Sequence, residues 1–296
     1  MQTTVQIHKL ALLGVGYIGG SAVVAARRAG LAGQRGQQIV GYDPSPDALR
    51  AAVRLGVIDG ACTSLQEAVA DASFVLIAAP VCSMESLLRD MAPGLARDAT
   101  VIDVGSVKGS IVKAAEAVLP AGCFVGCHPM AGAEYSGVEA ANPDIFAGRV
   151  CFVCPSQGVR PSATAAAHAF WRGIGCQTAD IEPMVHDRLM AAQSHLPHVA
   201  AYALAGALAP SLPFLDSTTS VASPTTSLRD TTRIAASGPA VWRDILLANA
   251  ANVLPLIQDL ETSVAAIKAA VATGDGDALE KILAAAQACR KRLVKE

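Results

Sequence analysis

Short apolar runs alternate with amphipathic segments through the first half of the chain. Their composition predicts strands at residues 9–15, 38–43, 74–80, 100–105, 123–129 and 149–155. The segments between them fit helices or loops at residues 18–30, 45–55, 64–70, 83–91 and 108–118. Strands that are apolar along their whole length are typical of sheets buried on both faces. The pattern therefore predicts an α/β fold of the Rossmann type, with a doubly wound, mainly parallel sheet.

The strand pattern ends near residue 180, and the rest of the chain is helical in pattern. Residues 186–209 predict a helix that Pro197 can bend. Residues 237–274 predict one long helix with Ser237 as its N-cap, and residues 277–294 predict a last helix. We divide the chain into an α/β domain at 1–178 and an all-helical domain at 179–296. Helices this apolar need more packing surface than one copy offers, which predicts a homodimer formed through the helical domain.

Composition narrows the possible partners. The chain has 296 residues, is 52% hydrophobic and 16% charged, and has a net charge of −2. Without a basic face, nucleic acid is not an expected partner. No signal peptide and no membrane span is expected, which predicts a soluble cytoplasmic protein. The eight cysteines are expected to be reduced core residues and no metal is expected, because the pairs Cys123/Cys127 and Cys151/Cys154 fall in predicted strands, where their thiolates cannot share one ion.

A glycine motif directly follows the first predicted strand. Gly14, Gly16 and Gly19, with Tyr17 and Ile18 between them, open the next helix in the spacing GxGxxG. These glycines allow a tight turn and close approach to a pyrophosphate, which the helix N-terminus also attracts. Asp43 ends the second strand, where an acid binds ribose hydroxyls and repels a 2′-phosphate. This predicts NAD as cofactor and makes NADP less favoured, although Arg50 can weaken that preference.

Several polar or loop residues follow other strands of the predicted sheet. Pro80, Ser106 and His128 all lie at or just beyond the carboxyl ends of strands. A parallel sheet brings these ends to one edge, where ligands of such folds bind. Pro80 and Ser106 are therefore predicted to border the cofactor, and His128 to face the nicotinamide. Taken alone, His128 would more often be a structural loop residue, and Ser106 is also a candidate helix N-cap.

Five motifs resemble those of the prephenate dehydrogenase family. They occur in the family's order across nearly the whole chain: Gly14-Val-Gly16-Tyr-Ile-Gly19, Asp103-Val-Gly-Ser106-Val-Lys108, His128-Pro-Met-Ala-Gly132-Ala-Glu134-Tyr-Ser-Gly137, Ser194-His195-Leu-Pro-His198 and Asp230-Thr-Thr-Arg233. The resemblance implies a nucleotide-binding domain, a helical dimerisation domain and the oxidative decarboxylation of a cyclohexadienol, with prephenate as substrate.

The resemblance also implies roles for individual residues. His128 would be the catalytic acceptor for the substrate hydroxyl, and Ser106 would bridge cofactor, His128 and substrate. Arg233 would bind a substrate carboxylate. Three further residues would complete the site: Asp230 and Glu134 as braces for Arg233, and Trp242 near the substrate ring or in the dimer core.

One helix is expected to add two more site residues. Asp187 and His198 are eleven residues apart, about three turns, and so are predicted to share a helix face. His198 would then touch substrate while Asp187 sets its tautomer. His195 lies off that face and is interpreted as a packing residue. Lys108 is expected to pair or cap.

Three alternatives stay open at this level. Arogenate in place of prephenate, or both, would fit the same motifs, although Ala133 offers no acid for an ammonium group. A second alternative is another Rossmann-type reductase, of the hydroxyacid or imine class. The third is an NAD-binding sensor without catalysis.

Overall fold

The computed structural model describes residues 7–132, 135–214 and 224–294. Its sheet has eight strands in the order β3-β2-β1-β4-β5-β6-β7-β8. Every neighbouring pair is parallel except β6 and β7. The strands are β1 Lys9–Leu13, β2 Gln38–Tyr42, β3 Gly60–Ala61, β4 Phe74–Ile77, β5 Thr100–Asp103, β6 Phe124–Pro129, β7 Val150–Cys154 and β8 Gln177–Asp180. The mainly parallel sheet is confirmed; the short β3 and the polar β8 lack the apolar signal of the predicted strands.

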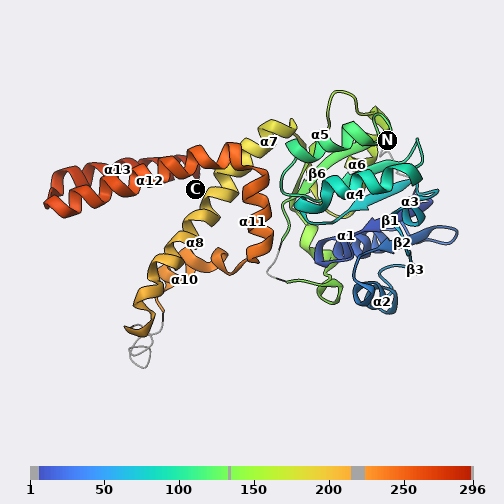
Figure 1. Ribbon diagram of the computed structural model, residues 1–296, viewed down its shortest axis with the longest axis horizontal. Helices are drawn as coiled ribbons and strands as arrows, with labels where there is room; N and C mark the ends of the chain where they lie inside the picture. Colours follow the sequence, from blue (N-terminus) through green and yellow to red (C-terminus); the bar gives the residue numbers. More distant parts are fainter. Residues whose placement is uncertain (1–6, 133–134, 215–223, 295–296) are drawn as a thin grey trace.

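Helices cover both faces of this sheet (Figure 1). They are α1 Tyr17–Arg28, α2 Pro46–Arg54, α3 Leu65–Val69, α4 Met84–Met91, α5 Gly109–Val118 and α6 Pro161–Gly173, with the short turns η1 Val81–Ser83, η2 Ala92–Gly94, η3 Val138–Ala140 and η4 Pro143–Phe146. Alternate residues of β1 enter opposite cores: Leu10 and Leu12 pack with α1 and α6, while Ala11 and Leu13 pack with α3, α4 and α5. This alternation is why the strands are apolar throughout, as predicted.

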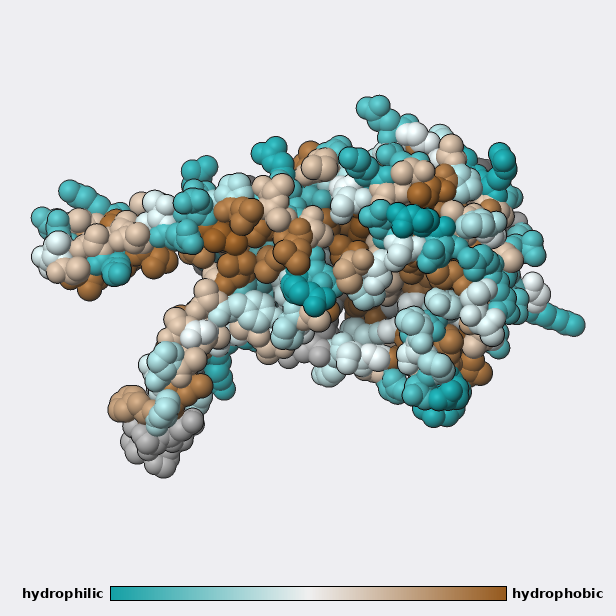
Figure 2. All heavy atoms as spheres, viewed as in Figure 1, coloured by the Kyte–Doolittle hydropathy of each residue, from teal (hydrophilic) through white to brown (hydrophobic). Residues whose placement is uncertain are grey.

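The second half of the chain is all-helical beyond β8. Its elements are α7 Pro183–Met190, a π-helical turn η5 Ala191–His195, α8 Leu196–Leu208, η6 Ala209–Ser211, α10 Thr226–Thr232, η7 Arg233–Ala236, α11 Pro239–Ala248, α12 Ala250–Thr273 and α13 Gly276–Leu293. Helices α8 and α10 form one arm and α12 and α13 another, and both arms project away from the α/β domain (Figure 1). Apolar surface gathers on this helical part (Figure 2).

The prediction of one helix over 237–274 is wrong. The chain bends by 101° between α11 and α12, at Asn249. The Asn249 side chain donates 2.8 Å to the Asp187 carbonyl and lies 3.1 Å from His195 Nδ1, so buried polar contacts stabilise the break. Ser237 is not the cap of α11, since Gly238 holds that position.

Two further sequence expectations concern membranes and cysteines. In the described ranges, no single helix is both long and apolar enough to cross a membrane; α11 and α12 meet that test only when counted together. All eight cysteines are free thiols and six are buried, as expected, but Cys82 and Cys289 are exposed. Among the described residues, no cluster of three or more histidine, cysteine or acidic side chains is arranged to hold a metal ion.

Candidate active site

The glycine loop after β1 is shaped for close approach of a ligand. Gly14 has φ +93°, and a Cβ there would lie 2.4 Å from the carbonyl oxygen of Ala78. Gly19 is also packed tightly, since a Cβ there would lie 2.7 Å from the Gly14 carbonyl oxygen. A Cβ on Gly16, in contrast, would meet nothing within 4 Å. Gly16 is the N-cap of α1 and has no side chain to bond the first amides, so these remain available to an anion.

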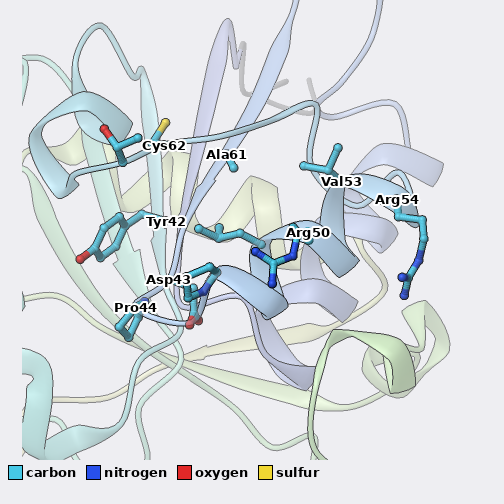
Figure 3. Close-up of a pocket in the computed structure, with 11 residues that line it drawn as sticks. Tyr42, Asp43, Pro44, Arg50, Val53, Arg54, Ala61 and Cys62 are labelled. Atoms are coloured by element: carbon cyan, nitrogen blue, oxygen red, sulfur yellow. The ribbon is translucent and has the colours of Figure 1, made fainter.

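Asp43 lies beside this loop, at the end of β2. Its carboxylate accepts from the amides of Val15 and Ser45, each at 2.8 Å. It borders a cavity of about 830 Å³ that Tyr42, Pro44, Arg50 and Arg54 also line (Figure 3). A carboxylate at this place suits ribose hydroxyls. Arg50 is paired with Asp47, which lessens the attraction its charge would exert on a 2′-phosphate.

His128 is the second-to-last residue of β6 and lies at the same edge of the sheet as the glycine loop, because β1, β4, β5 and β6 run parallel. Its Nδ1 lies 2.9 Å from Nε2 of His186, and the two rings meet edge to face. Burial lowers the pKa of His128 well below its usual range, and the nearby groups His186, Lys108 and His195 lower it further. The imidazole of His128 is therefore neutral at pH 7.

A buried ion pair supports the end of β6. Asp103 and Lys108 pair with both side chains fully buried, which confirms that Lys108 pairs. The Asp103 carboxylate also accepts from the amides of Gly105 and Cys127, each at 2.8 Å. Since Cys127 precedes His128, this pair ties the backbone before the histidine to β5.

Asp187 does not set the tautomer of His198, contrary to the prediction. Its carboxylate accepts from the amide of Lys108 at 2.7 Å, the amide of Gly109 at 2.8 Å and Nδ1 of His186 at 2.9 Å. Nδ1 of His198 donates instead to the carbonyl of Ser194 at 2.9 Å. The π-helical turn between Asp187 and His198 shifts the helical phase, so that eleven residues no longer place both on one face.

Asp187, and not Ser106, caps the start of α5. Lys108 holds the N-cap position of α5, and its own side chain makes no cap bond. The amides at this helix start are bonded by Asp187 from α7. Ser106 is thus not the N-cap, and it lies half-buried three residues after Asp103.

Two histidines of the helical domain lie against one aromatic ring, that of Trp242. His198 stacks on Trp242 with centroids 3.5 Å apart, and His195 meets the same ring edge to face at 5.9 Å. Burial lowers the pKa of His198; the bond to Ser194 opposes this, and the charge of Arg233 adds to the lowering. Burial lowers the pKa of His195 to about 4, against a partly opposing effect of Asp187. Buried against Trp242 and Asn249, His195 packs as expected.

The remaining predicted site residues differ in their burial and in the partners they have. In the described parts of the chain, Asp230 forms no ion pair with Arg233, so the predicted brace is not made. Glu134 and Ala133 lie outside the described residues. Pro80 precedes η1 beyond β4 and is exposed, as is Arg233 on η7. Within the glycine loop region, Tyr17 is buried and Ile18 packs against the core.

Sequence reasoning missed His186 and Asn249. The side chain of His186 links Asp187 to His128, and Asn249 joins α12 to α7 and His195. A signal for His186 was present, since a histidine beside an aspartate at the start of an apolar helix is unusual for a core position. Asn249 lies in a stretch whose pattern is helical throughout, so nothing in that pattern marks it as the residue where the helix breaks.

A glycine loop that opens a helix, an acid after the second strand and a neutral histidine on the same sheet edge define an NAD-dependent oxidoreductase of the Rossmann class. Models of two family domains match: the prephenate dehydrogenase nucleotide-binding domain over residues 27–179 and the prephenate dehydrogenase dimerization domain over 182–285. The chain belongs to the prephenate dehydrogenase family.

Two curated relatives and one solved structure show how far the similarity extends. A cyclohexadienyl dehydrogenase of Zymomonas mobilis is 33% identical over 91% of this chain and 90% of its own length. A prephenate dehydrogenase of Bacillus subtilis is 34% identical over 90% of this chain and 71% of its own length. A prephenate dehydrogenase from Aquifex aeolicus, solved with hydroxyphenyl propionate and NAD+, is 30% identical, with a TM-score of 0.82 over 99% of this chain and 100% of that one.

Proposed function

We propose that the chain catalyses the NAD-dependent oxidative decarboxylation of prephenate to 4-hydroxyphenylpyruvate, a step of tyrosine synthesis. The observation that carries this is the neutral imidazole of His128 at the sheet edge that bears the glycine loop. The Aquifex aeolicus relative holds NAD+ together with a hydroxyphenyl ring bearing a carboxylate side chain, which supports a substrate of this kind.

The nucleotide-binding residues fit NAD. The open face of Gly16 and the amides of α1 would receive the pyrophosphate, and Asp43 would receive the ribose hydroxyls. We propose that the cofactor site also includes Tyr17, Ile18, Pro80 and Ser106. When bound, NAD supplies the acceptor for the hydride that leaves the ring carbon bearing the hydroxyl.

His128 is proposed to accept the hydrogen of the substrate hydroxyl. As the hydride leaves, the ring carboxylate is lost as CO₂, the electrons of its C–C bond complete the aromatic ring, and the proton held by His128 returns to the phenolate oxygen of the product. A neutral imidazole polarises the O–H bond during this step, whereas an imidazolium has no lone pair to offer. The burial that lowers the pKa of His128 keeps the active form populated at pH 7. Ser106, three residues from the Asp103 that supports β6, is proposed to bridge His128 and the hydroxyl.

The cationic and aromatic groups of the helical domain are proposed to hold the rest of the substrate. Arg233 would bind a carboxylate, since a guanidinium offers a bidentate match. His198, stacked on Trp242, has its Nδ1 committed to Ser194 and presents Nε2 to the pyruvyl group. Glu134, Asp230 and Asp187 complete the proposed set, with Asp187 acting through the network described above.

The substrate assignment is tested by following NADH absorbance with the purified chain and either prephenate or arogenate. We expect formation of NADH with prephenate, at a kcat/KM above that for arogenate. Activity on arogenate alone would contradict the assignment. NAD binding without turnover of either compound would instead favour a sensor.

We propose that the chain forms a homodimer through its helical domain. Val264, Ile267 and Val271 repeat along one face of α12 and are exposed, and Leu283 on α13 is exposed as well. The match to a dimerization domain supports this interface. The cytoplasm remains our proposed location, because a reducing compartment suits eight free thiols.

Changing Ile267→Glu is expected to shift the protein from dimer to monomer, since the charge would be buried between two copies. Light scattering coupled to size-exclusion chromatography measures the mass. Leu55→Glu, at an equally apolar exposed position of the α/β domain, serves as control and should stay dimeric. A monomeric wild-type chain would contradict the proposal.

A further inference from the structure

We propose that His186 is a positioning residue that holds His128 in the tautomer with its hydrogen on Nδ1, leaving the Nε2 lone pair for the substrate. This inference rests on the proposed role of His128. It follows from a chain of two hydrogen bonds, from Asp187 to His186 and from His186 to His128.

The first link of this chain has a defined direction. An ionised carboxylate only accepts hydrogen bonds, so Nδ1 of His186 must donate to Asp187. Asp187 cannot turn away, because its two oxygens also accept from the amides of Lys108 and Gly109 at the start of α5. These amides are backbone groups of a helix end, so they hold the carboxylate in a fixed place.

The direction of the second link follows from the first. With its hydrogen on Nδ1, a neutral His186 carries a lone pair on Nε2 and acts as an acceptor. The Nδ1 of His128, 2.9 Å away, must then be the donor. A neutral imidazole has only one N–H, so Nε2 of His128 carries the lone pair that the proposed reaction needs.

The surroundings of His128 disfavour an added proton on its ring. His186 is fully buried, and its ring is flanked by Phe152 at 5.7 Å. Lys108 already supplies one buried positive charge near His128, paired with Asp103, and His195 lies within electrostatic reach of both imidazoles. A proton on His128 would place a second cation near Lys108, where burial already disfavours charge.

Removing the acceptor should release the ring of His128. Without His186, Nδ1 of His128 loses its hydrogen-bond acceptor, and the tautomer with hydrogen on Nε2 becomes accessible. That tautomer presents a donor to the substrate hydroxyl and cannot take its hydrogen. We therefore expect an effect on turnover rather than on substrate affinity.

The test uses His186→Leu, which fills the space without an acceptor, and His186→Gln, whose side-chain carbonyl can accept from Nδ1. We expect His186→Leu to lower kcat about 10²-fold, the lower end of what a positioned proton acceptor contributes, with little change in KM. His186→Gln should recover most of this loss. His168→Leu is the matched control, since His168 is hydrogen-bonded to Thr178 and Asp180 at the far strand β8, and it should leave kcat unchanged.

Nitrogen NMR of the ¹⁵N-labelled full chain reads the tautomer directly. In the wild type, the Nδ1 of His128 should show the shift of a protonated nitrogen and Nε2 that of a bare one. A wild-type spectrum with the hydrogen on Nε2, or with His186 doubly protonated at pH 7, would overturn the inference even if a variant failed to fold. So would a His186→Leu variant with unchanged kcat and unchanged tautomer.

The two proposals fail in different ways. If His128→Asn leaves turnover unchanged, the role of His128 is wrong and the positioning role falls with it. If His128→Asn is strongly impaired while His186→Leu is not, only the positioning role is wrong.

Discussion

Replacing His128 with asparagine is expected to lower kcat for prephenate about 10²- to 10⁴-fold, the range that a positioned proton acceptor contributes. Asparagine keeps a polar side chain of smaller size but has no basic nitrogen to take the hydroxyl hydrogen. NAD affinity should not change, because the glycine loop and Asp43 lie at the ends of β1 and β2, on different strands from His128. Steady-state kinetics and a fluorescence titration with NADH measure the two effects separately.

His8→Asn is a matched control, since His8 is an exposed histidine before β1. It should leave kcat and NAD affinity unchanged.

The acid side of the pH profile adds an independent check on His128. Because burial holds the pKa of His128 well below 6.5, kcat/KM should stay level as the pH falls through 6.5 and decline only further down. Unchanged turnover in His128→Asn would refute the assigned role.

Replacing Lys108 with methionine is expected to cost about 3–5 kcal/mol of unfolding free energy. The side chains of Lys108 and Asp103 are both fully buried, so the change leaves a carboxylate in the core without its cation. Asp103 also holds the amides of Gly105 and Cys127, next to His128. A loss of order around the site should therefore accompany the loss of stability. Urea unfolding followed by circular dichroism measures the change.

Arg89→Met removes a cation from an exposed ion pair with Glu85 and serves as control. It should cost less than about 1 kcal/mol, as is usual for surface pairs. The double change Asp103→Asn with Lys108→Met should be less destabilising than Lys108→Met alone, because no unpaired charge remains. A Lys108→Met protein as stable as the wild type would show that the pair is not needed for the fold.

Most strands of the α/β half could be predicted from the sequence because the signals for them are local. Apolar runs mark β1, β2, β4, β5, β6 and β7, and the glycine spacing with Asp43 marks the nucleotide site. The helical half was harder to predict. Asn249 interrupts a pattern that is helical on both sides, and the break is stabilised by Asp187 and His195, which are more than 50 residues away.

The errors at the site have the same origin. Spacing predicted that Asp187 and His198 share a helix face. A π-helical turn between them changes the helical phase, and the carboxylate of Asp187 accepts instead from amides at the start of α5. Ser106 and Lys108 belong to one motif, yet the cap of α5 came from Asp187 on α7. Hydrogen-bond partners across elements leave no trace in residue spacing, because they depend on how the elements pack.

The sequence by itself predicted six of the strands, the helices between most of them and the glycine loop after β1, since each depends on periodicity or on residues close together in the chain. Only the tertiary structure decided that Asp187, His186 and His128 form one hydrogen-bonded line, and that the last helices turn at Asn249. The physical reason is that a buried polar group must find a partner wherever packing offers one. Which partner a buried polar group finds depends on how the elements pack against one another.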